Sequence, residues 1–194
     1  MKTLTVLLSL IFLSSAAHAM ERETLIGNNG DIHHGGMGGV IIKGTNIGGT
    51  NQVMVGGKGA WLIDHQLYIG GSGYGATREL NANNTNYNIG LGGVMMGYFF
   101  LPHKLIHVGT EIVVGGGGIA ESNMMDDYDS HGHNKGDSLF YAEPSVYASL
   151  NILPYAKVTA GVSYRYVLGS DTVGISDEDL RGFNAEVSIL FGRF

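Results

Sequence analysis

The chain contains no cysteine, only 3 prolines and few charged residues, which make up 14% of its 194 residues. Without cysteine, neither disulfide bonds nor thiol chemistry can contribute to its stability or function. Charged residues make up about a quarter of a typical soluble protein, so this chain has little surface suited to water. The formal net charge is −6 and no run of Lys or Arg is present, which argues against nucleic acid as a partner, because binding phosphate requires a basic surface.

Long apolar runs are missing as well. No segment approaches the ~20 consecutive apolar residues of a transmembrane helix, and the longest run, at 4–13, is far shorter. An open sheet cannot exist in lipid, because its edge N–H and C=O groups would lack partners. If this chain crosses a membrane, it must therefore cross as a closed β-barrel.

The N-terminal residues have the layout of a secretory signal peptide. Lys2 follows the first Met, an apolar run occupies 4–13, and Ala17 and Ala19 form a small-residue cleavage site. We therefore expect three parts: a cleaved signal peptide at 1–19, a glycine-rich lead at 20–35 and a folded domain at 36–194.

Glycine is unusually abundant, with 32 residues, but it follows no Gly-X-Y period. A collagen-like chain is therefore excluded, and 3 prolines are too few for a Pro/Gly-rich disordered chain. Glycine at this density within Val-, Ile- and Tyr-rich segments indicates strongly bent strands, in which backbones or large side chains approach closely.

Apolar and polar residues alternate with a period of two in eight segments bounded by turn residues. Most are about 12 residues long, closer to the ~9–11 residues of a membrane-spanning strand than to the globular mean of ~5–6. The pattern predicts an all-β fold, an eight-stranded antiparallel transmembrane up-and-down barrel. The predicted strands are 36–47, 52–63, 67–78, 87–101, 106–120, 139–152, 156–168 and 182–194.

The connections alternate between short and long. Tight turns are expected at 64–66, 102–104 and 153–155, and the broader loops lie at 80–86, 121–138 and 169–180. Outer-membrane barrels combine short periplasmic turns with long extracellular loops. With an even number of strands, both ends of the barrel chain lie on the side of the short turns.

Each predicted strand has one apolar face, and its few charges fall on the other. An eight-stranded barrel is only wide enough to be filled by side chains, so the charged face is expected to point inward. Buried charges need partners, so these residues should form a pairing network that closes the interior. The predicted network comprises Lys43, Lys58, Glu111, Glu143, Lys157, Arg165 and Glu186, with Arg78 as a further candidate.

The segment Ala17-His18-Ala19, the eight alternating segments and the C-terminal 188–194 together resemble the small outer-membrane barrels of the OmpA/OmpX-like group. This resemblance implies residence in the outer membrane of a diderm bacterium, contact with membrane lipid, and a role for Phe194 in the signal read by the barrel-assembly machinery. Phe194 is out of phase with Phe191, so a bulge near Gly192 is expected. We expect a monomer. Members of the group serve as structural proteins, adhesins, evasion factors or lipid-modifying enzymes, so the fold does not choose among them.

The loop 121–138 concentrates carboxylates and imidazoles, which could ligate a divalent metal. Its candidate ligands are His131, His133, Asp127 and Asp129. The spacing also resembles a calcium loop, but Ser138 stands where a bidentate Glu is required. A solvated loop and no cofactor are therefore predicted. His33 and His34 form a weaker candidate pair.

An enzyme would need a nucleophile, a base and an orienting group within reach of one another. His107 and Glu111 share one strand face, and Ser145 or Ser149 on the next strand could approach them. No Gly-x-Ser-x-Gly elbow is present, and Glu111 is more simply an ion-pair partner. We predict a non-catalytic structural or surface-interaction protein acting through the three long loops. A lipid-modifying hydrolase and a narrow channel remain the alternatives.

Overall fold

The structure is a computed structural model that describes residues 32–82, 85–121, 136–169 and 176–194. These residues belong to the compact unit Ile32–Phe194. The predicted signal peptide at 1–19 lies outside the described residues and stays a prediction.

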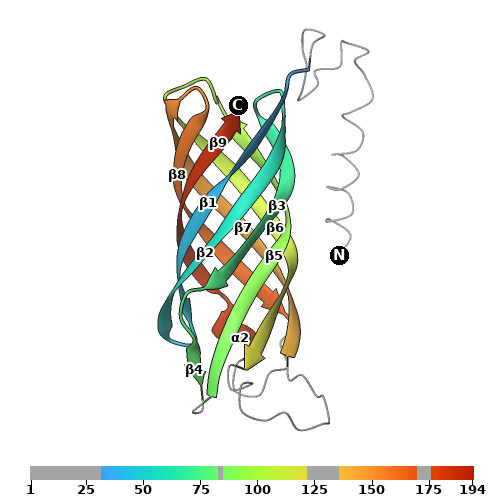
Figure 1. Cartoon of the computed structure of the whole chain (residues 1–194), viewed down its shortest axis with the longest axis vertical. Helices are drawn as coiled ribbons and strands as arrows, with labels where there is room; N and C mark the ends of the chain where they lie inside the picture. Colours follow the sequence, from blue (N-terminus) through green and yellow to red (C-terminus); the bar gives the residue numbers. More distant parts are fainter. Residues whose placement is uncertain (1–31, 83–84, 122–135, 170–175) are drawn as a thin grey trace, which may run out of the picture. The chain divides into compact units, whose positions relative to one another are not determined.

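One antiparallel sheet makes up this unit (Figure 1). Eight strands close into an up-and-down barrel, because β3 pairs with β5 and so joins the two ends of the sheet; β4 is a short extension that pairs only with β5. The fold class expected from the sequence is thus confirmed. The strands are β1 (His34–Ile47), β2 (Thr50–Ile63), β3 (Leu67–Ala76), β4 (Leu80–Ala82), β5 (Thr85–Phe100), β6 (Ile106–Glu121), β7 (Gly136–Leu153), β8 (Ala156–Leu168) and β9 (Gly182–Arg193).

Two of the predicted loops contain regular structure. The loop 80–86 includes β4 and the start of β5, since Leu80 pairs with Tyr87 and Ala82 with Thr85. The loop 169–180 includes the short helix α2 (Asp177–Leu180). The period-two pattern could not indicate either element, because β4 has three residues and α2 has four.

The two ends of the barrel differ. The turns 64–66, 102–105 and 154–155 lie at one end, here called the turn end, together with Phe194. α2 and the turn at Gly48 lie at the other, here called the loop end, where Gly48 N–H donates to Asp179 O at 3.0 Å. Figure 1 shows α2 and β4 at the end of the barrel opposite the C-terminus. No helix in the described part of the chain is long and apolar enough to cross a membrane.

Alternation along the strands separates an apolar outer face from a buried inner face. Along β9, for example, Asn184, Glu186 and Ser188 are buried, whereas Val187 and Ile189 are exposed. Outward apolar side chains reach exposures of 62% at Val94 and 76% at Phe183. Soluble monomers rarely expose contiguous apolar patches larger than a few hundred Å², so a belt of this kind around a closed sheet suits lipid and not water.

Most aromatic residues near the strand ends join this outer belt, among them Trp61 and Phe140. Tyr68 and Phe99 do not, because both are fully buried inside the barrel. Each shares the inward phase of its strand.

Candidate functional site in the barrel interior

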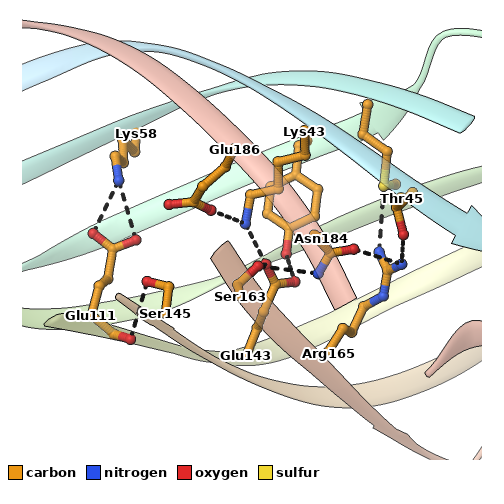
Figure 2. A network of polar contacts seen from close by, with 12 residues as sticks. Lys43, Thr45, Lys58, Glu111, Glu143, Ser145, Ser163, Arg165, Asn184 and Glu186 are labelled. Carbon is orange, nitrogen blue, oxygen red and sulfur yellow. Dashed lines mark hydrogen bonds and ion pairs between the residues drawn. The ribbon is translucent and has the colours of Figure 1, made fainter. Parts of the chain in front are cut away.

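All seven residues of the predicted network are buried inside the barrel. They come from six strands, β1, β2, β6, β7, β8 and β9. The alignment of neighbouring strands in the barrel brings them together. Arg78, the further candidate, is instead exposed beyond the end of β3, so its inclusion was wrong. Figure 2 shows how six of the seven, with their polar neighbours, follow one another along the interior.

Nearer the turn end, Lys58 and Glu111 face each other across the barrel. Lys58 Nζ lies 3.2 and 3.1 Å from the two carboxylate oxygens of Glu111. Tyr68 OH donates to Glu111 Oε2 at 2.6 Å, and it lies 2.8 Å from Tyr147 OH. Because Tyr68 has already donated its hydrogen, Tyr147 is the donor between the two phenols. The buried carboxylate is thus held by one ammonium and one phenol.

In the middle of the barrel, Lys43 lies between two carboxylates (Figure 2). Its Nζ pairs with Glu143 Oε1 and lies 3.0 Å from Glu186 Oε2. Glu143 also accepts hydrogen bonds from Tyr74 OH at 2.6 Å and from Ser163 Oγ at 2.7 Å. Breaking such a buried pair by removing one partner typically costs several kcal/mol, so this cluster fixes the packing of the interior.

Towards the loop end, the partners of the Arg165 guanidinium among the described residues are all neutral. It donates to Thr45 Oγ1 at 2.7 Å, to Asn184 Oδ1 at 3.4 Å and to the backbone oxygen of Leu180 at 2.9 Å. Leu180 belongs to α2 and its side chain is buried in the core. Arg165 therefore attaches the loop-end helix to the barrel wall.

A capping box forms the N-terminus of α2. Asp179 N–H donates to Ser176 Oγ at 3.3 Å, while Ser176 N–H donates to Asp179 Oδ2 at 2.9 Å and Ser176 Oγ to the same oxygen at 2.8 Å. The N–H and the hydroxyl of Ser176 stabilise the charged carboxylate and hold the pKa of Asp179 below its usual value. The cap defines a four-residue helix that would not form alone.

At the turn end, Lys157 is buried with an exposure of 3%. Its Nζ lies over two aromatic rings, 4.5 Å from the centre of Phe99 and 4.2 Å from that of Phe194. No Asp or Glu carboxylate of the described residues is within ion-pair distance of it. The predicted network thus places Lys157 in the interior, but the structure gives it aromatic rings in place of a carboxylate.

The contact with Lys157 explains the phase of Phe194. The β1–β9 register is continuous from Thr45↔Asn184 to Gly36↔Arg193, so the bulge expected near Gly192 is absent. Phe194 is partly buried and packs against the core. It shares the inward phase of Asn184 and Ser188. Phe194 is out of phase with Phe191 because Phe194 points into the barrel and Phe191 points outward. Its role as an assembly signal stays a prediction.

Two inward-facing glycines leave room for the interior phenols. A Cβ at Gly109 would lie 2.5 Å from the ring of Tyr147, and a Cβ at Gly97 would collide with the ring of Tyr68. These two rings hold the Glu111 layer together. The close approach predicted from the glycine content therefore occurs where the polar interior requires it.

The hydrolase residues lie close together but do not form a catalytic arrangement. His107 pairs in register with Ser149, and Glu111 with Ser145. The Glu111 carboxylate is bound by Lys58 and Tyr68, and Ser145 Oγ donates to the Glu111 backbone oxygen at 3.3 Å. Neither His107 Nε2 nor Ser149 Oγ has a hydrogen-bond partner within the described part of the chain. All four side chains are buried in the lumen, away from the lipid that such an enzyme would attack.

The metal candidates of the loop 121–138 stay untested. His131, His133, Asp127 and Asp129 lie outside the described part of the chain. Elsewhere the described ranges contain no group of three or more His, Asp or Glu side chains placed to hold a metal ion. His33 stacks on His65 with ring centres 5.5 Å apart, and His34 stacks on Trp61 at 5.3 Å.

The phenols Tyr68, Tyr74 and Tyr147 are among the interior residues that the predicted network omits. In a strand pattern, tyrosine counts as an ordinary strand former, so its hydroxyl carries no signal. The position of each tyrosine along its strand does carry a signal. Tyr68 and Tyr74 share the face of Ser72, and Tyr147 shares the face of Glu143 and Ser145. Phase and polarity together would have found them.

Comparison with known proteins agrees with this geometry. Neisserial surface protein A superposes with a TM-score of 0.55 at 12% identity, covering 84% of this chain and 99% of that one. This chain has the fold of the small outer-membrane β-barrels. The N-terminal barrel of Pseudomonas aeruginosa OprF shares this outer-membrane barrel fold, with a TM-score of 0.50 at 11% identity over 80% of this chain and 96% of that domain. No family model and no curated protein matches the sequence.

Proposed function

We propose that this chain is an integral barrel of a bacterial outer membrane that acts without catalysis, as a structural or surface-interaction protein. The observation that carries the proposal is the combination of an apolar outer belt with a buried and largely paired polar interior. Lipid is the solvent that such an outer face requires. An interior filled by side chains offers no route for a solute.

The loop end is the surface we propose for interaction. It carries the segments 80–86, 121–138 and 169–180, and in the described part of the last one α2 is attached to the barrel through Arg165 and Gly48. Extracellular loops of this fold vary while the barrel supports them. The loops would therefore select the partner, and the barrel would set their position.

Fractionation and gel migration test the membrane assignment. We expect the protein to sediment with the outer membrane and to migrate differently on gels before and after boiling, because a closed barrel resists detergent until it is heated. Recovery in the soluble periplasmic fraction would refute the proposal.

Planar-bilayer recording and lipid turnover separate the alternatives. A filled interior predicts no discrete conductance steps, so stable open-channel currents would favour a narrow channel. The single variants His107→Ala, Ser145→Ala and Ser149→Ala should leave membrane-lipid turnover equal to that of the wild type. Loss of turnover in any of them would favour a hydrolase.

A further inference from the structure

The turn end contains a cavity of about 650 Å³, lined by residues from three turns and by Phe194. Its lining combines a buried lysine, two imidazoles, two amides and the carboxylate of Asp64 with apolar surface from proline, leucine and isoleucine. The residues that matter for the argument are Lys157, Asn151, His65, His103 and Asp64. Pockets in which a few polar groups converge within apolar walls are the usual form of a small-molecule site.

Lys157 supplies a buried positive charge to this cavity. Phe99 and Phe194 lie over its ammonium, and aromatic rings attract a cation without accepting strong hydrogen bonds. The ammonium therefore keeps donor capacity that no Asp or Glu of the described residues takes up. A buried cation in this state favours an anionic oxygen.

Asn151 supplies an acceptor beside it. Asn151 and Lys157 pair in register across β7 and β8, so their side chains share the inner face. Asn151 Nδ2 donates to the backbone oxygens of Pro102 and Lys104, both at 2.9 Å. Two carbonyl partners fix the amide nitrogen on that side, so Oδ1 is the atom left over, and it is buried without a partner.

The cavity thus offers a donor cation and an orphaned acceptor on adjacent strands. We propose that it binds the C-terminus of a short peptide, whose carboxylate pairs with Lys157 and whose last amide N–H donates to Asn151 Oδ1. The pairing satisfies Asn151 Oδ1, which otherwise carries the cost of an unmet polar atom, and gives the Lys157 ammonium an anionic partner. Only the placement of this end in the periplasm rests on the proposed function; binding itself does not depend on it.

N-acetylalanine is the minimal probe, since it carries one carboxylate and one adjacent N–H. We would titrate it into the full mature chain folded in detergent micelles and follow the Asn151 side-chain amide by NMR. N-acetylalanine amide lacks the carboxylate and propionate lacks the N–H. We expect N-acetylalanine to bind at least about tenfold more tightly than either, because each analogue loses a hydrogen bond to a buried group.

Variants test the cation. Lys157→Met keeps the stem and removes the charge, and should weaken N-acetylalanine binding at least about tenfold. Lys104→Met is the matched control, because Lys104 is exposed at the same end and should change binding less than about twofold. Altered migration on heating checks that each variant has folded.

Three results would overturn the proposal. They are no binding of N-acetylalanine to the wild type at ~50 mM, equal binding of all three probes, or unchanged binding in Lys157→Met. The probe series uses only the wild type, so it remains decisive if the variant does not fold. Failure here would leave the outer-membrane assignment standing, since fractionation tests that separately.

Discussion

At the scale of single residues, the interior is held by a few ions whose partners are equally buried. Lys58 and Glu111 show this most clearly, since neither has access to water. Replacing both partners with apolar residues can cost little, whereas removing one leaves the other charged and alone. The arrangement therefore predicts strong coupling between the two positions.

Lys58→Met should lower the free energy of unfolding by about 3 kcal/mol, because the Glu111 carboxylate would remain buried without its ammonium. The double variant Lys58→Met/Glu111→Gln should recover a large part of that loss. Urea unfolding followed by the fluorescence of Trp61, the single tryptophan, measures both. Additive effects of the two single substitutions would contradict a coupled pair.

Gly109→Ala should destabilise the barrel by about 1–3 kcal/mol, because its methyl group would overlap the ring of Tyr147. Gly90→Ala is the matched control, since nothing lies within 4 Å of a Cβ there, and it should change stability by less than about 0.5 kcal/mol. Thermal unfolding in one detergent compares the two. Equal effects would show that the close approach carries no constraint.

At the scale of elements, the sequence predicts the strands well, but it does not predict which residues of different strands meet. Period two assigns Lys43, Glu143 and Glu186 to one face because phase is a local property. It cannot say that Lys43 meets both carboxylates, because contacts across a barrel depend on the stagger between strands. α2 was missed for another reason: its four residues are too short for a helical period, although the capping pair Ser176 and Asp179 was readable.

The capping box makes the attachment of α2 sensitive to acid. The lowered pKa of Asp179 means that its stabilising contribution is present above the unfolded pKa and is lost as pH falls through the folded one. We expect the Gly48 amide, which donates to Asp179 O, to keep its protection from exchange at neutral pH and to lose part of it below pH ~4. Once the exchange rates are corrected for the intrinsic effect of pH, Asp179→Asn should remove the pH dependence of Gly48 protection. The same loss of protection in acid in that variant would show that the Asp179 carboxylate is not its cause.

At the scale of the whole molecule, closure of the sheet separates an apolar outer face from a charged inner face. A sheet that joins β3 to β5 has no free edge within the barrel, which satisfies the backbone in lipid. The interior then receives four cations and three carboxylates, Lys43, Lys58, Lys157 and Arg165 against Glu111, Glu143 and Glu186. Lys157 and Arg165, the two of these cations that pair with no carboxylate of the described residues, lie towards opposite ends. Lys157 lines the turn-end cavity and Arg165 contacts α2.

The central claim is that the outer face of this closed barrel lies in lipid, and spin labelling in bilayers tests it most directly. The chain has no cysteine, so single cysteines at Ala160, Val162 and Tyr164 can be labelled. Ala160 and Val162 point outward along β8 between the turn end and the loop end, and Tyr164 continues the same face. We expect high collision rates with oxygen and low rates with a water-soluble nickel chelate at all three. High nickel accessibility at all three positions would contradict the account.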